Sequence, residues 1–114
     1  MSVPHPIPDM LIELIAQRFR VLGEPMRIRI LDRLRTAPAT VQELADALGT
    51  SQQNVSKHLG VLAQAGVVAR AKDRNFAVYS IADQGVFRLC EEVCGSLQQQ
   101  VAELHQLIGE EVSR

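Results

Sequence analysis

Two short helical segments, separated by a turn of three residues, occupy the middle of this sequence. The first covers residues 41–48, and Thr40 with Glu43 three positions later form the pair that closes a capping box at its start. Gly49 ends this helix, and Ser51 follows as the cap of a second helix. Two short helices joined by a glycine-containing turn are typical of a helix-turn-helix.

The hydrophobic period changes after the second of these helices, which is expected to end at residue 65. Residues 67–72 and 76–81 predict two short strands joined by a turn at residues 73–75. Apolar residues recur at helical spacing in three further segments, residues 9–22, 25–36 and 84–112. The order of elements predicts a mostly α, winged helix-turn-helix fold, with about five helices and a two-stranded β-hairpin as the wing.

Two observations set the expected domain organisation. Pro4, Pro6 and Pro8 alternate with other residues, so residues 1–8 are expected to form a flexible arm. Residues 9–114 are expected to form one winged helix-turn-helix domain. Its last helix carries one apolar stripe that a domain of this size does not cover by itself, so a homodimer through the first and last helices is expected. The stripe consists of Val86, Cys90, Val93, Leu97, Val101, Leu104 and Ile108.

Charge distribution favours a nucleic-acid partner more than the net charge of −1 indicates. Residues 51–82 carry four cations against one acid, whereas residues 83–114 carry two cations against six acids. No Gly-rich phosphate loop and no nucleophile with a suitably spaced base is present, so an enzyme is not expected. The sequence has neither a signal peptide nor a membrane-spanning run, and we expect a cytoplasmic protein without membrane contact.

The second helix of the pair divides into an apolar and a polar face. Val55, Leu59 and Leu62 fall on one side at 100° per residue, and Gln53 and Lys57 fall on the other. Amide side chains can read adenine in the major groove, and Lys can reach guanine or a phosphate. The alternative is that this polar face is simply exposed to solvent. Because a short helix precedes it and a basic hairpin follows it, we favour contact with double-stranded operator DNA.

The predicted hairpin adds cations to this surface, with Arg74 at its tip as the first candidate for phosphate contact. Solubilising charges on an edge strand are the alternative. His58 lies at the margin of the apolar face and is expected to pack or to form a hydrogen bond, not to bind a metal. The residues expected to contact DNA are Ser51, Gln52, Gln53, Asn54, Ser56, Lys57, Arg70, Lys72 and Arg74.

Three segments resemble the ArsR/SmtB family of bacterial repressors. Residues 51–68, SQQNVSKHLGVLAQAGVV, are similar to the family's recognition-helix signature. Residues 22–31, LGEPMRIRIL, are similar to the start of its second helix, and residues 79–83, YSIAD, to its exit from the wing. The resemblance extends over roughly residues 10–105. It implies a symmetric dimer that represses an operator until a metal ion or another chemical signal binds.

The resemblance also locates the family's best-known zinc site on this chain. Its ligand positions correspond to Asp83, Gly85, Ser96 and Gln99, so that only the first retains a ligand side chain. The Cys-x-Cys box that some members carry before the recognition helix has no counterpart in residues 40–48. Neither of these two metal sites is therefore expected.

Cys90 and Cys94 remain as candidate sensor residues. Two thiols on successive helical turns can bind one soft ion, such as Cd²⁺, Pb²⁺ or As(III), with a third ligand, and His105 on the same side could supply it. If two copies of this helix cross antiparallel near residue 92, a thiol-oxidising signal could instead link Cys90 of one copy to Cys94 of the other. The alternative is that both cysteines are small core residues and that no cofactor binds.

The sequence thus predicts a sequence-specific DNA-binding transcriptional regulator, and more specifically a repressor that a small effector releases. Two alternatives stay open. One is a DNA-binding regulator that needs no effector, and the other is a winged-helix protein-interaction module that does not bind DNA.

Overall fold

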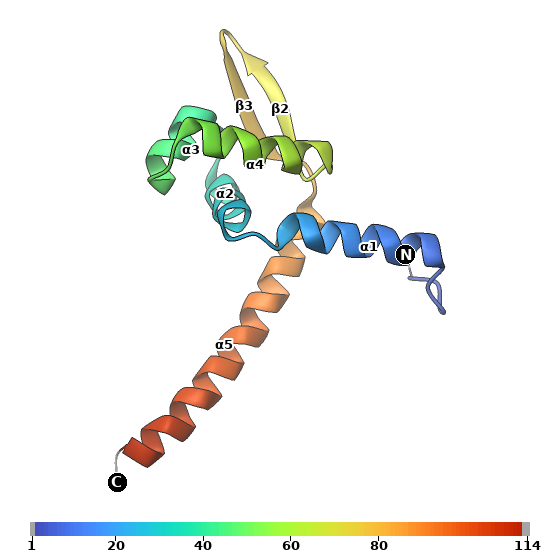
Figure 1. Ribbon diagram of the computed structural model, residues 1–114, viewed down its shortest axis with the longest axis vertical. Coiled ribbons are helices and arrows are strands. Elements are labelled where there is room, and N and C mark those ends of the chain that lie inside the picture. Colours follow the sequence, from blue (N-terminus) through green and yellow to red (C-terminus); the bar gives the residue numbers. More distant parts are fainter. Residues whose placement is uncertain (1, 113–114) are drawn as a thin grey trace. The chain divides into compact units, whose positions relative to one another are not determined.

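The computed structural model describes residues 2–112, with the side chains of residues 2–109. The chain forms two compact units that divide after Ala82. The first unit contains α1 (Asp9–Leu22), α2 (Pro25–Thr36), β1 (Ala39–Thr40), α3 (Val41–Leu48), α4 (Gln52–Gln64), β2 (Val68–Asp73) and β3 (Phe76–Ile81) (Figure 1). The second unit contains α5 (Gln84–Val112).

Local capping signals set the helix bounds of the first unit. In the capping box of α3, the Thr40 backbone N–H donates to Glu43 Oε1 at 2.9 Å and the Glu43 N–H donates to Thr40 Oγ1 at 3.1 Å. Helix α2 begins with Pro25 after Glu24, whose carboxylate accepts from the Arg27 N–H at 3.1 Å. The predicted bounds of α1, α2 and α3 are confirmed.

The strands form one antiparallel sheet in the order β1-β3-β2. The predicted hairpin is present, and the structure adds β1 as a third strand, with Ala39 opposite Tyr79. Strand β1 has only two residues and runs directly into the cap of α3, so it is too short to show an alternating pattern in the sequence. Strand β2 extends to Asp73, which leaves Arg74 and Asn75 as a two-residue turn.

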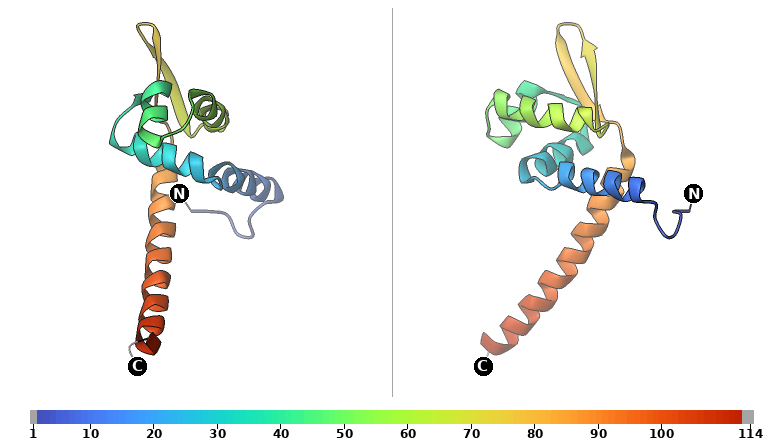
Figure 2. Two further views of the ribbon diagram at one scale, coloured as in Figure 1. Left: turned by 60° about the vertical axis from the view of Figure 1, so that its left-hand side comes forward. Right: turned by 45° about the vertical axis from the view of Figure 1, so that its right-hand side comes forward.

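The core of the first unit lies where α2, α3, α4 and the base of the sheet meet. Figure 2 shows α3 and α4 beside α2, with the β2–β3 hairpin projecting beyond the helices. The buried side chains are aliphatic, as expected from a sequence with three Phe, one Tyr and no Trp. They include Ile30, Leu31, Leu34, Leu44, Val55, Leu59, Leu62, Val67 and Val68.

Helix α5 is a single helix of 29 residues. It begins as predicted after Asp83, whose Oδ1 accepts from the Gly85 N–H at 2.9 Å. Within residues 2–112, no helix has the combination of length and apolar character that crossing a membrane requires. Residues 2–8 contain neither helix nor strand, and the flexibility of this arm stays a prediction.

Candidate nucleic-acid interface

Helix α4 separates an apolar from a polar side, as its sequence predicts. Val55, Leu59 and Leu62 have no exposed surface, whereas the side chains of Gln53 and Lys57 are exposed. The buried side chains fix α4 against the core, so the polar side must face away from it. The exposed side of helix α4 therefore presents the hydrogen-bonding side chains of Gln53, Lys57 and Gln64, with a single charge.

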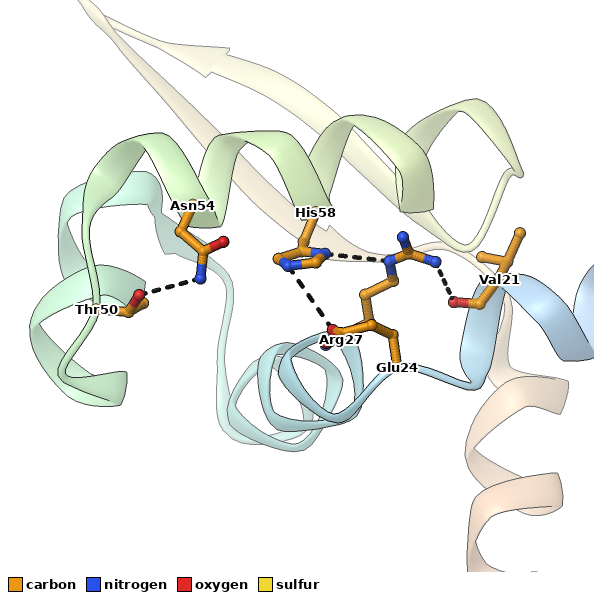
Figure 3. A network of polar contacts seen from close by, with 6 residues as sticks. All are labelled: Val21, Glu24, Arg27, Thr50, Asn54 and His58. Atoms are coloured by element: carbon orange, nitrogen blue, oxygen red, sulfur yellow. Dashed lines mark hydrogen bonds and ion pairs between the residues drawn. The ribbon is translucent and has the colours of Figure 1, made fainter.

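The first turn of α4 uses part of the predicted DNA-contact set for its own stability. The Ser51 hydroxyl accepts from the Asn54 backbone N–H at 3.0 Å and caps the helix. The side-chain Nδ2 of half-buried Asn54 donates to Thr50 Oγ1 at 3.1 Å (Figure 3). Ser51 and Asn54 thus hold the turn before α4, while the exposed side chains of Gln52 and Gln53 are the more accessible groups at this end.

The wing carries three of the predicted contact residues, and all of them are exposed. Every second side chain of β2 lies on the same face of the sheet, so Val68, Arg70 and Lys72 share one face. Val68 is buried at the base of this face, and the two cations continue it toward the tip. Arg74 lies in the turn at the tip with φ 59°, in the left-handed region that favours glycine. Asp73 is the only acidic residue of the hairpin, so the hairpin has a net positive charge.

Sequence reasoning did not single out Phe76, which is 63% exposed at the start of β3 and pairs with Asp73. Phe76 is thus an exposed aromatic side chain next to the turn that carries Arg74. The sequence signal was its position directly after the turn, where the alternation of the strand places it on the face opposite Arg70 and Lys72.

A polar network lies behind α4, on its buried side (Figure 3). His58 is 5% exposed, and its Nδ1 accepts from Arg27 Nε at 3.2 Å. Its Nε2 lies 3.7 Å from Glu24 Oε2. Arg27 Nη1 also donates to the Val21 carbonyl oxygen at 2.9 Å. The prediction that His58 packs and forms a hydrogen bond is confirmed.

The two thiols differ in environment. Cys90 is half-buried, and this burial raises the pKa of its thiol above the ordinary value, whereas Cys94 is exposed. Cys94 and His105 line one shallow groove along α5, so they lie on the same side of the helix, as expected. They are eleven positions apart, which corresponds to about 16 Å along the helix axis. Among the described residues no three His, Cys, Asp or Glu side chains come together as a metal-ion cluster. Metal binding at the cysteines stays a prediction.

Comparison with known proteins shows which family the chain resembles. Residues 22–71 match the family described as a helix-turn-helix domain. The uncharacterized HTH-type transcriptional regulator Rv0081 of Mycobacterium tuberculosis is 42% identical over 80 residues, which cover 69% of this chain and 70% of the relative. The HTH-type transcriptional repressor SmtB of the same organism is 38% identical over 82 residues, covering 72% and 61% of the two chains.

Solved structures agree with the sequence matches. The crystal structure of Rv0081 superposes with a TM-score of 0.76 at 36% identity and covers 84% of this chain and 97% of that protein. The solution structure of a Mycobacterium bovis fragment, described as a homodimeric winged helix-turn-helix DNA-binding domain of a possible ArsR-family regulator, has a TM-score of 0.76. It covers 88% of this chain and 95% of the fragment, and at 24% identity it supports the fold alone.

The predicted class of protein is confirmed by these matches, because the relatives are transcriptional regulators with a helix-turn-helix and are not enzymes. This chain belongs to the ArsR/SmtB family of winged helix-turn-helix transcriptional regulators.

Proposed function

We propose that the protein is a homodimeric repressor that binds a palindromic operator with one α4 from each copy in the major groove. The observation that carries this proposal is the composition of α4, where an exposed polar face lies over a fully buried apolar face behind a Ser51 cap. A helix held in this way keeps its outward side chains in fixed positions, which base recognition requires.

Gln53 and Lys57 lie one helical turn apart on the outward face of α4 and are the proposed base-reading pair. The Gln53 amide can donate to and accept from the edge of an adenine, and the Lys57 ammonium can donate to guanine acceptors or a phosphate. Asn54 is proposed to contribute its amide oxygen near the start of the helix, and one hydrogen of its Nδ2 is already donated to Thr50 Oγ1.

The proposed role of the wing is to hold the DNA backbone. Arg70, Lys72 and Arg74 are exposed cations on a hairpin that projects beyond the helices (Figure 2). Such contacts supply affinity and orientation and do not distinguish sequences. The division of labour is therefore recognition by α4 and phosphate binding by the wing.

A homodimer is proposed because two helices present large apolar side chains to solvent. On α5, Val93, Leu97, Val101, Leu104 and Ile108 are 49–54% exposed and share one stripe. On α1, Met10, Leu14 and Phe19 are 78%, 61% and 53% exposed. Apolar surface on this scale marks an association site, and a second copy of the chain is a matching cover. The M. bovis fragment, which has the same fold, is itself described as homodimeric.

We further propose that repression ends when a soft metal or metalloid ion bridges thiols of the two copies. The exposed Cys94 is the accessible thiol, and Cys90 lies one turn away on the same stripe. The raised pKa of Cys90 makes its thiolate scarce, which disfavours direct oxidation, whereas a metal ion displaces the thiol proton as it binds. Because the ligands of one ion must come from both copies, binding would change how the copies meet and lower operator affinity.

The effector-independent alternative rests on Cys90, which is half-buried, as expected of a small residue that packs. One experiment separates the possibilities. Genomic DNA fragments retained by the purified protein are sequenced without additive and with Cd²⁺, As(III) or peroxide.

Enrichment of one palindromic sequence supports operator binding, and retention of no specific fragment contradicts it. Loss of that enrichment with an additive, together with its persistence in the Cys90→Ser, Cys94→Ser variant, supports the thiol sensor. If no additive changes the enrichment, or if the variant responds like the parent, the two cysteines only pack the dimer.

A further inference from the structure

The buried side of α4 is connected to the end of α1 through two side chains. His58 of α4 accepts a hydrogen bond from Arg27 Nε at 3.2 Å, and the Nη1 of the same guanidinium donates to the carbonyl oxygen of Val21 at 2.9 Å (Figure 3). Arg27 thus bridges the helix proposed to enter the groove and the last turn of the helix proposed to dimerise. A second link joins the two helices at the other end of α4, where Arg18 Nη2 of α1 donates to the carbonyl oxygen of Ala65, the C-cap of α4, at 3.0 Å.

The geometry selects one form of the His58 ring. Because Nδ1 accepts from Arg27, it carries no proton, and the neutral ring holds its hydrogen on Nε2. That side of the ring faces the carboxylate of Glu24, with Nε2 at 3.7 Å from Oε2. Glu24 is itself fixed, because its side chain caps α2 by accepting from the Arg27 backbone N–H. Both ring nitrogens therefore face α2, one toward a cation and one toward an anion.

Burial makes this arrangement costly to break. His58 is 5% exposed, so water does not readily replace a lost partner of its Nδ1. The buried apolar side chains of α4 hold it against the core, and the two charge-assisted hydrogen bonds of Arg27 add contacts of defined geometry. The Arg27 bridge therefore adds a directional link between α4 and the last turn of α1.

We propose that His58 and Arg27 are positioning residues that transmit the placement of the dimer helix α1 to the recognition helix α4, and so fix the distance between the two half-sites that the protein accepts. This inference rests on the proposed function, because it needs a dimer that binds a palindrome. A dimer reads two half-sites about one helical turn of DNA apart, and the position of each recognition helix relative to the dimer axis determines that distance.

The test measures discrimination between spacings. The operator selected by the parent protein is compared with versions that have one base pair inserted or removed at the centre, and the ratio of the Kd values is the readout. This ratio does not depend on the fraction of active protein. We expect the parent to lose about tenfold in affinity for the altered spacing, the scale of one wrong base pair.

His58→Phe keeps a ring and removes the acceptor, and Arg27→Met removes the bridge from the other side. Both should reduce the spacing ratio to about threefold or less, while a single half-site is bound as by the parent. His58→Asn restores an acceptor near the Nδ1 position and should recover most of the ratio. Arg35→Ala is the matched control, because it also removes one cation from α2. Among the described residues Arg35 pairs with the exposed Asp32, so this substitution should leave the ratio unchanged.

Nitrogen NMR of His58 in the parent gives a second readout, and it should show the neutral ring with the hydrogen on Nε2. A parent that binds no operator contradicts the proposed function itself. A parent that binds but ignores spacing, or variants that lose the hydrogen bond and keep the parent ratio, overturn only the positioning role. A ratio that His58→Asn does not recover also counts against the role of the Arg27 contact.

Discussion

Arg74 offers the sharpest test of the wing, because its charge and its backbone conformation predict separable effects. Each phosphate contact releases counterions and contributes about −0.9 to the slope of log K against log salt concentration. A dimer presents Arg74 twice, so Arg74→Ala should flatten that slope by about 1.8 for every DNA sequence. Arg74→Lys keeps the charge and should leave the slope close to that of the parent.

The backbone supplies the second effect. Arg74 has φ 59°, a conformation that costs a residue with a side chain roughly 1–2 kcal/mol and costs glycine little. Arg74→Gly should therefore be more stable than Arg74→Ala by about 1 kcal/mol, although both lose the same phosphate contact. The higher entropy of glycine in the unfolded chain reduces this difference but does not remove it.

Two assays decide the matter. Operator affinity is measured at several salt concentrations for the parent and the three variants, and urea unfolding gives their stabilities. If Arg74→Ala retains the parent slope, the wing is not a phosphate clamp. If glycine and alanine are equally stable at this position, the strain assigned to the turn is absent.

Three further substitutions and one labelling experiment test other parts of the molecule. Leu97→Glu would place a carboxylate in each copy of the apolar stripe, at a cost of several kcal/mol per dimer, so sedimentation should show monomers that bind operator weakly; an intact dimer would exclude α5 from the interface. In that monomer, iodoacetamide should modify exposed Cys94 before Cys90, whose pKa is raised by burial, as peptide mass mapping can show; the opposite order would contradict the described burial. Gln53→Ala should relax base preference in a selection experiment and leave the salt slope unchanged, and a changed slope with unchanged preference would assign Gln53 to the backbone. The pKa of Glu43 is lowered, chiefly by the hydrogen bond from the Thr40 backbone N–H. Its carboxylate therefore stabilises α3 fully at a pH above the ordinary carboxyl pKa, and this stabilisation is lost as the pH falls through the lower pKa of the folded state. Glu43→Gln should reduce the pH dependence of unfolding in acid, and an unchanged dependence would argue against the capping box.

The sequence determines most helices of the first unit through local signals. Thr40 with Glu43, and Ser51 with Asn54, act over three residues, so a cap can be recognised without knowing the rest of the fold. The division of α4 into two faces follows from helical geometry alone. These features predict the exposed polar side of α4, and contact of this side with DNA stays a prediction.

Other features depend on contacts between distant segments. Strand β1 has two residues and exists through its pairing with β3, about forty positions later. The bridge from His58 through Arg27 to Val21 joins residues up to 37 positions apart, and no periodicity marks it. Asn75 is the residue type that tolerates a left-handed conformation better, but the residue that adopts it is the adjacent Arg74. The register of the two strands, and not residue preference, fixes which position has this conformation.

Two copies of α4 are proposed to read one palindromic operator. Hydroxyl-radical footprinting of the DNA fragment selected by the parent protein tests it at the resolution of single nucleotides. We predict two protected regions related by two-fold symmetry, with centres about 10 base pairs apart or a multiple of that distance, flanked by weaker protection from the wings. Protection of a single region, or uniform protection without symmetry, would contradict a dimer that places one recognition helix in each half-site.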